Sequence, residues 1–282
     1  MKLFRILFVF LLFYYSALVN ASPKIFSSVQ GGFAELSSLT ESDYQWIGAK
    51  IFQNEAASKP KYLTHWGKGE DFPSFGIAHF IWFPENIHPP FEETFPAMVR
   101  FVSLTKQPPA WLQKLAAKNT GFHAPWKSKK DFEQGGESSE QQQLRNWLLA
   151  TQSQQARFVA LSFEKRWLKE VSSLSQAKQV ELNQQLKQMM SFKQGLFAVI
   201  DYFNFKGIGH NAKEQYQGQS WGLISVLEAM STNPPASNSL QLEQFITAAK
   251  SRLQLRTELA PAERRESRWI PGWFKRLDRY SE

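Results

Sequence analysis

Cysteine is absent from all 282 residues of the chain. No disulfide can therefore form, and lipidation on a cysteine at an export cleavage site is excluded. Small exported domains usually depend on disulfides, whereas a chain of this length can bury a core of its own. We expect a domain that is held together by packing alone.

A long apolar run is missing as well. The apolar stretch near the start, from Ile6 to Val19, is shorter than the about 20 residues that a membrane-spanning helix needs. It follows Lys2 and Arg5 and ends at Val19-Asn20-Ala21, which fits a small-residue cleavage site. We predict that residues 1–21 are a signal peptide, with an uncleaved anchor as the alternative. The mature protein would be periplasmic or secreted, with no stable membrane span.

Motifs for metals and nucleic acids are missing too. There is no HExxH and no cysteine-based ligand spacing, and His65, His79 and His88 lie on segments expected to be irregular or β-type. We therefore predict no metal and no cofactor. The net charge of +8 falls to +6 once Lys2 and Arg5 are removed. A basic exported protein suits an anionic polymer such as the bacterial wall, and no nucleic-acid partner is expected.

What the sequence does contain is one dense polar and aromatic stretch, residues 54–84, that begins at the end of an amphipathic helix. Thr40 is expected to cap the segment ESDYQWIGAKIFQNE, with Asp43 in its first turn. Glu55 falls on the same four-residue repeat as the apolar residues of this helix, so its carboxylate should lie near the buried stripe. Burial raises a carboxyl pKa, as a general acid near neutral pH requires. A frayed helix end with Glu55 in water is the alternative.

Two adjacent acids follow this helix, Glu70 and Asp71. In a β-type segment they would point to opposite faces, so only one could face a cleft, and we favour Glu70. Trp66 and Trp82 flank the acids and are expected to hold a sugar.

The run SFGIAH, residues 74–79, resembles the Thr-Ile-Gly-x-Gly-His run of phage-type lysozymes, in which a hairpin follows a helix-terminal Glu. The serine stands for the threonine, Ala78 stands for the second glycine, and the interval from Glu55 is longer. The strings GEDFPSFGIAHFIW, NFKGIG and YQGQSWGL also look like those of exported bacterial proteins of the lysozyme-like superfamily.

This resemblance implies a role for each matching residue. Glu55 would be the general acid, Ser74 would help to orient the attacking water, and His79 would close the motif. Either Glu70 or Asp71 would take the place of the second carboxylate.

A second block, residues 201–230, combines planar amides with aromatic side chains. Such groups suit sugars, and we predict that this block forms the wall of the cleft opposite Glu55. The alternative is a glycine-capped turn between helices whose polar side chains face water. The residues expected to bind substrate here are Tyr216, Gln217, Gln219 and Trp221.

Arginines alternate with aromatic residues from Arg252 to Arg279. Their stems can pack across aromatic rings as part of the structure. Alternatively, their guanidinium groups can contact an anionic wall polymer or peptide carboxylates.

These patterns and the resemblance predict an α+β fold that is mainly α. We expect a single lysozyme-like domain over residues 22–282, with a helical lobe, helical extensions, and a small β-hairpin that carries the site. An exposed polar connection is expected near residues 127–140. The predicted function is cleavage of peptidoglycan glycan strands by a glycosidase. The alternatives are a lytic transglycosylase that uses Glu55 alone and an inactive protein that binds cell-wall glycan.

Overall fold

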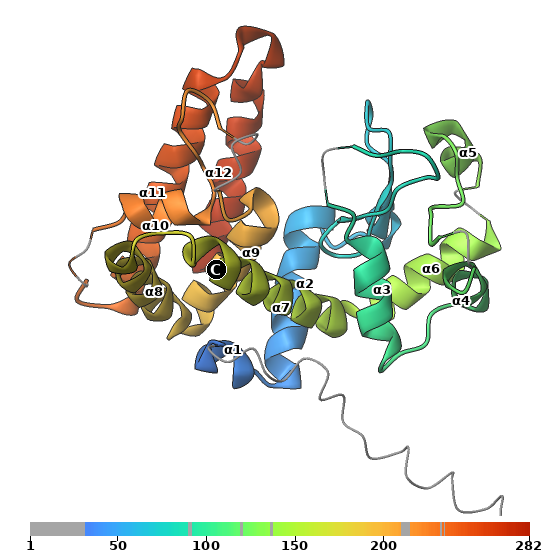
Figure 1. The fold of residues 1–282 in the computed structure, drawn as a ribbon, viewed down its shortest axis with the longest axis horizontal. Helices are drawn as coiled ribbons and strands as arrows, with labels where there is room; N and C mark the ends of the chain where they lie inside the picture. The colour runs from blue at the N-terminus through green and yellow to red at the C-terminus, as the bar shows by residue number, and fades with distance from the viewer. Residues whose placement is uncertain are drawn as a thin grey trace, which may run out of the picture. The chain divides into compact units, whose positions relative to one another are not determined.

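The computed structural model describes residues 32–89, 92–118, 121–135, 138–209, 215–231, 233 and 235–282. The predicted signal peptide lies outside these residues. The described chain has a mainly α, α+β fold (Figure 1), as predicted. The helices are α1 Ala34–Ser37, α2 Glu41–Ala56, α3 Phe95–Ser103, α4 Ala110–Ala116, α5 Lys129–Gln134, α6 Ser139–Ala150, α7 Gln152–Val171, α8 Gln176–Met190, α9 Lys193–Lys206, α10 Leu223–Ala229, α11 Asn238–Leu259 and α12 Ile270–Asp278. Short 3₁₀ turns occur at η2 Pro60–Leu63, η4 Ala262–Arg264, η5 Glu266–Trp269 and η6 Arg279–Ser281. Within the described residues, no helix combines the length and the apolar character needed to cross a membrane.

Helix α2 begins at a capping box. The Thr40 side chain accepts from the backbone N–H of Asp43, and the Asp43 carboxylate accepts from the backbone N–H of Thr40. The apolar side of the helix is buried and packs mainly against α7. The helix ends at Ala57, which adopts a left-handed conformation. Glu55 therefore lies in the last turn, and the predicted bounds of this helix are confirmed.

A three-stranded antiparallel sheet follows α2, formed by β1 Thr64–His65, β2 Ser74–Phe75 and β3 Phe80–Ile81. The predicted hairpin is its β2–β3 pair, in which Phe75 lies opposite Phe80. The sheet is held by the packing of Phe75, which is fully buried against the rings of Trp82 and Phe95. In Figure 1 the sheet lies to one side of the α2 C-terminus, and α11 and α12 lie to the other.

The side chain of Gln155 in α7 holds the β2–β3 turn through hydrogen bonds. The Gln155 side-chain oxygen accepts from the backbone N–H of Ile77 at 2.9 Å, and its amide donates to Leu148 and Thr151. Gly76, at the start of the turn, has φ +76°, and a Cβ atom there would lie 2.3 Å from that same oxygen. The turn therefore needs glycine for two separate reasons.

Replacing Gly76 by alanine is expected to destabilise the protein more than the same change at Gly69. Gly69 also has a positive φ, +82°, but nothing lies within 4 Å of its added Cβ. The left-handed backbone alone costs an alanine about 1–2 kcal/mol, and the collision with Gln155 adds to this only at Gly76. Urea unfolding of the two variants measures the difference. Equal losses would mean that Gln155 moves aside without cost.

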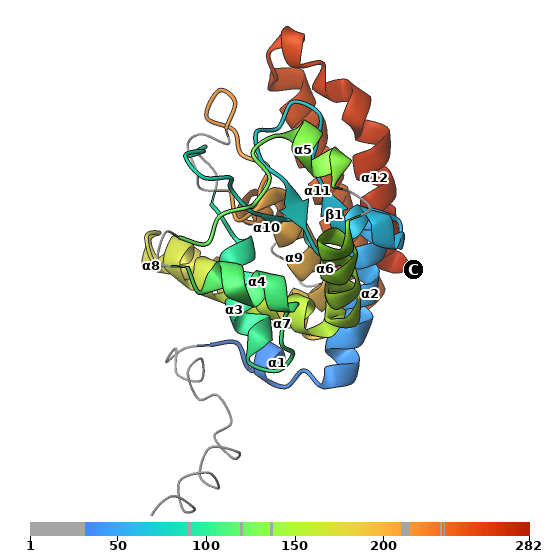
Figure 2. The ribbon, with the colours of Figure 1, turned by 90° about the vertical axis from the view of Figure 1, so that its right-hand side faces the viewer.

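Helix α9 is the most buried of the described helices, and it lies near the middle of the view in Figure 2. Its core positions include Phe197, Tyr202 and Phe203, together with one carboxylate, Asp201. It packs against α7, α8, α10 and α11. An apolar helix with one buried acid therefore lies at the centre of the helical packing.

The polar stretch near residues 127–140 is not simply an exposed connection. It contains α5, where Phe132 is buried and packs against Trp66. Gln141, at the start of α6, is also buried and donates to the Phe132 carbonyl. The other described side chains of residues 127–140 are exposed or half-buried, so one aromatic residue anchors an otherwise polar segment.

Candidate functional site

The Glu55 carboxylate is the centre of the candidate site. Its side chain is 15% exposed at the end of α2. One oxygen, Oε1, lies 2.7 Å from the Arg276 guanidinium and accepts from the Asn204 amide at 3.0 Å. The other oxygen, Oε2, lies 3.6 Å from Nδ1 of His79. The carboxylate is thus fixed through one oxygen, while the other faces an imidazole.

Arg276 of α12 also binds a second carboxylate. Its Nε and Nη2 atoms donate to the two oxygens of Asp201 at 2.7 and 2.9 Å, and the Tyr280 hydroxyl donates to Asp201 at 2.8 Å. Arg276 and Asp201 are both buried. One guanidinium therefore ties α2 and α9 to α12.

The sequence interpretation missed Arg276, Asp201 and Asn204. A signal for Asp201 was present, because a lone acid within an apolar helix needs a buried cationic partner. Nothing in the sequence indicates which of the C-terminal arginines is that partner.

The predicted rise in the pKa of Glu55 was wrong. Burial does raise it, but the charges of Arg276 and His79 and the hydrogen bonds from Arg276 and Asn204 outweigh burial, so the pKa lies below its usual 4.5. Glu55 is therefore ionised in the free protein. Ionised, it can accept a proton or stabilise positive charge, but it holds no proton to donate.

His79 lies in the β2–β3 turn and reaches Glu55 because of an unusual backbone. Its φ is +51°, a conformation that few residues other than glycine and asparagine adopt readily. Its second ring nitrogen, Nε2, is buried and has no hydrogen-bond partner among the described residues. The rings of His65 and His79 are stacked, with their centres 6.1 Å apart. Burial and the nearby His79 both lower the pKa of His65.

Ser74 lies near this pair without touching Glu55. It is buried in β2 opposite His65, and cross-strand partners share one face of a sheet. Within the described residues, no hydrogen bond joins its hydroxyl to Glu55. Its predicted role in orienting water stays a prediction.

Glu70 and Asp71 are exposed in the loop between β1 and β2, so the assumption that they lie in a β-type segment was wrong. Glu70 closes this loop locally, since its carboxylate accepts from the Gly67 N–H at 3.0 Å and its carbonyl accepts from the Trp66 indole at 2.7 Å. The negative charge of Glu70 raises the pKa of His65, so Glu70 lies near the pair formed by His65 and His79. No contact joins either acid to Glu55 in the part of the chain that is described.

The tryptophans expected to hold a sugar are mostly in the core. Trp82 is fully buried, and its indole donates to the Phe122 carbonyl. Trp66 is buried beneath the Glu70 loop. Neither presents an open ring face, because both side chains, which directly follow β1 and β3, pack into the core.

The second predicted block is partly accessible. Tyr216 is half-buried, its hydroxyl donates to Glu266 at 2.9 Å, and its ring packs on Trp221, which is buried. Gln217 and Gln219 are exposed, and Gln219 accepts from Arg252. Trp221 is thus a packing residue, and only the other three offer groups to a ligand.

A line of cationic and aromatic side chains connects this block to Glu55. The Arg256 guanidinium lies 4.5 Å from the Trp221 ring and 5.2 Å from the Trp273 ring. The ring of Phe205 lies 6.3 Å from Trp273 and 4.4 Å from the Arg276 guanidinium that binds Glu55. Residues of α12 therefore stand between the two predicted walls.

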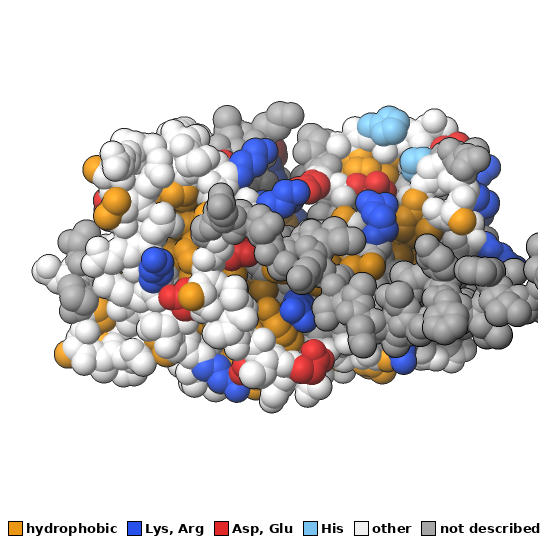
Figure 3. All heavy atoms as spheres, turned by 60° about the horizontal axis from the view of Figure 1, so that its bottom comes forward, with side chains coloured by type: hydrophobic (Ala, Val, Ile, Leu, Met, Phe, Trp, Pro, Cys, Tyr) orange, Lys and Arg blue, Asp and Glu red, His pale blue; other side chains and the backbone are white. Residues whose placement is uncertain are grey.

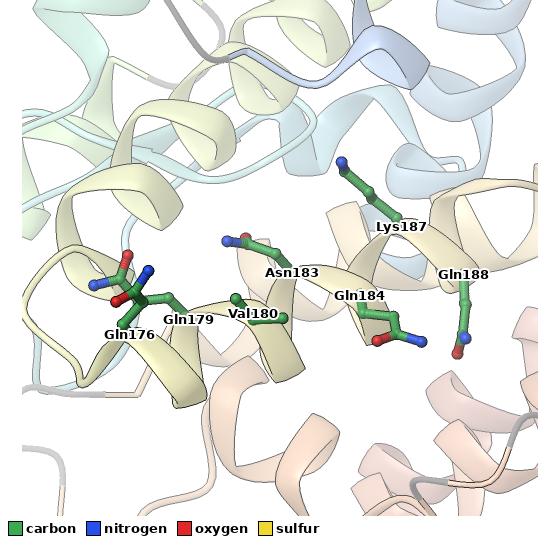
Figure 4. Close-up of a pocket in the computed structure, with 7 residues that line it drawn as sticks. All are labelled: Gln176, Gln179, Val180, Asn183, Gln184, Lys187 and Gln188. Carbon is green, nitrogen blue, oxygen red and sulfur yellow. The ribbon is translucent and has the colours of Figure 1, made fainter.

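A hollow of about 630 Å³ lies on the α8 surface. Its lining residues are amides, one valine and one lysine, and all project from α8 (Figure 4). None of them belongs to the candidate site. The hollow has neither a carboxylate nor an imidazole, so we do not assign chemistry to it.

On the face shown in Figure 3, lysine and arginine are scattered among acidic and apolar side chains. No three histidine or acidic side chains in the described residues are grouped so that they could hold a metal ion.

Comparison with protein-family models, curated proteins and solved structures found no match to this chain.

Proposed function

We propose that the protein is an exported enzyme that cleaves the glycan strands of bacterial peptidoglycan at Glu55. The observation that carries the proposal is the position of this carboxylate at the end of a helix. One oxygen is anchored by Arg276 and Asn204, and the other is paired with His79 of the adjacent hairpin.

The pair can divide the proton transfers between its members. In its protonated form His79 donates the proton of Nδ1, the nitrogen that faces Glu55, to the glycosidic oxygen as the C1–O bond breaks. The Glu55 carboxylate stabilises the positive charge that develops on the sugar. Glu55 then takes the proton from the attacking hydroxyl and returns it to His79 across the 3.6 Å that separates them. The cycle closes with no net change in the enzyme.

The attacking hydroxyl is proposed to be the 6-hydroxyl of the same sugar, which makes the enzyme a lytic transglycosylase. This alternative is favoured over two-carboxylate hydrolysis because Glu70 and Asp71 are exposed and do not contact Glu55. The other nearby acid, Asp201, is buried against Arg276. A single accessible carboxylate suits an intramolecular attack.

A second function is favoured by the ion pairs themselves. A carboxylate with a lowered pKa that shares a guanidinium with a buried acid is also what a purely structural network contains. On this view the protein binds wall glycan and does not cleave it.

Mass spectrometry of material released from purified peptidoglycan by residues 22–282 separates these functions. Anhydro ends would support the transglycosylase, and reducing ends would support a hydrolase in which water replaces the 6-hydroxyl. Binding without released fragments would leave the glycan-binding protein.

Replacing His79 by asparagine is expected to lower the rate of fragment release by about 10²–10⁴-fold, the usual contribution of a general acid. Asparagine tolerates the left-handed backbone at this position, so the turn should survive. The control is His88→Asn, because His88 is exposed. An unchanged rate in a folded His79→Asn protein would remove His79 from the mechanism and contradict the proposed division of the proton transfers.

A further inference from the structure

Lys206 is the last residue of α9, and its amine is held between two aromatic rings. The Nζ atom lies 4.0 Å from the centre of the Phe205 ring and 3.8 Å from that of Trp273. The side chain is partly exposed. Within the described residues, no hydrogen bond or ion pair reaches this amine. Lysine ammonium groups that are withdrawn from water normally have an anionic partner.

The charges around Lys206 are already paired with one another. Arg256 of α11 binds Glu266 of η5 at 2.6 Å, and Arg264 binds the same carboxylate at 3.0 Å. Arg276 of α12 binds Glu55 of α2. Neither acid is therefore available as a counter-ion for the amine.

Burial is the main reason why the pKa of Lys206 falls to about 6, and the charges of Arg256 and Arg276 lower it further. Glu266 and Glu55 act in the opposite direction but do not compensate. Near neutral pH the amine is mostly uncharged. An anion that arrived beside it would restore the charge by drawing a proton onto Nζ.

We propose that Lys206, together with the arginines on either side of it, forms a subsite for a carboxylate carried by the glycan. On peptidoglycan strands from which the stem peptides have been removed, every second sugar carries such a group on a lactyl ether, whereas uncharged glycans carry none. The assignment to the wall sugar rests on the proposed function. The carboxylate subsite itself rests on the unpaired amine and its surroundings.

The two sugars N-acetylmuramic acid and N-acetylglucosamine are a matched pair of probes, because they differ only in the lactyl ether that carries the carboxylate. Neither sugar has a bond for the enzyme to cleave, so binding is measured separately from activity. At pH 5.5, where the Lys206 amine is mostly charged before the ligand arrives, we expect the wild type to bind the acidic sugar about 10- to 100-fold more tightly, the effect of one charge-assisted hydrogen bond. Calorimetry at pH 7.5 in two buffers of different ionisation enthalpy should show uptake of about one proton with the acidic sugar only.

Two variants test the amine itself. Lys206→Met keeps the apolar stem between the rings and should abolish the preference for the acidic sugar. Lys206→Arg carries a permanent charge and should keep the preference without proton uptake. If Lys206→Met does not fold, as judged by thermal unfolding, Lys206→Arg still decides on proton uptake.

Equal binding of the two sugars by the wild type would overturn the subsite, even if the protein digests peptidoglycan. So would proton uptake that persists in Lys206→Arg. A preference for the acidic sugar without any digestion would keep the subsite and reject the proposed function.

Discussion

Replacing Glu55 by glutamine is expected to lower the rate of fragment release from peptidoglycan by about 10²–10⁴-fold. Glutamine keeps the shape of the side chain but can neither accept the proton of the attacking hydroxyl nor stabilise a cationic sugar. The fold should survive, because Arg276 keeps both of its hydrogen bonds to Asp201. The rate is measured by mass spectrometry of released fragments, and folding by circular dichroism.

Glu85→Gln is the matched control, since Glu85 is exposed. Full activity in a folded Glu55→Gln protein would contradict the proposed function.

The pH dependence of the stability of wild type and Glu55→Gln is a second test of this carboxylate. A carboxyl whose pKa is lowered by folding stabilises the protein above its unfolded value, near 4.5, and loses this effect as the pH falls through the folded value. Wild type and variant should therefore become equally stable on acidification.

The largest loss of stability is expected from Arg276→Met. This change leaves Asp201 and Glu55 without their guanidinium, and the Asp201 side chain is fully buried. Breaking a buried ion pair by removal of one partner costs about 3–5 kcal/mol. Chemical unfolding monitored by tryptophan fluorescence measures this loss.

The double variant Arg276→Met, Asp201→Asn should be more stable than Arg276→Met alone, because it no longer buries an unpaired charge. Arg268→Met serves as the control, since Arg268 is exposed and surface changes usually stay within about 0.5 kcal/mol. A single variant as stable as wild type would mean that water reaches Asp201 and that the network is not structural.

Local patterns predicted the helices well. The capping residue Thr40 and the apolar repeat placed the end of α2 next to Glu55. These features depend on residues three or four positions apart. Such local patterns were sufficient for this helix, whereas the hairpin beside it was expected from the resemblance of residues 74–79 to phage-type lysozymes.

The electrostatics of the site could not be predicted in the same way. The pKa of Glu55 depends on Arg276, which lies in the last helix, and on a left-handed turn that brings His79 close. The tryptophans misled for a related reason. An aromatic residue near polar groups is equally compatible with a binding surface and with a core, and Trp82 belongs to the core.

The Arg276 bridge also makes the candidate site depend on one short helix. Helix α12 packs mainly against α11, and its guanidinium is what holds Glu55 in the ionised form next to His79. Undocking of α12 would leave the Asp201 carboxylate of α9 buried without a charge partner, and it would expose Leu277 and Tyr280, which are buried. On mild heating the site should therefore persist, and Glu55 should stay beside His79 until the core around α9 itself unfolds.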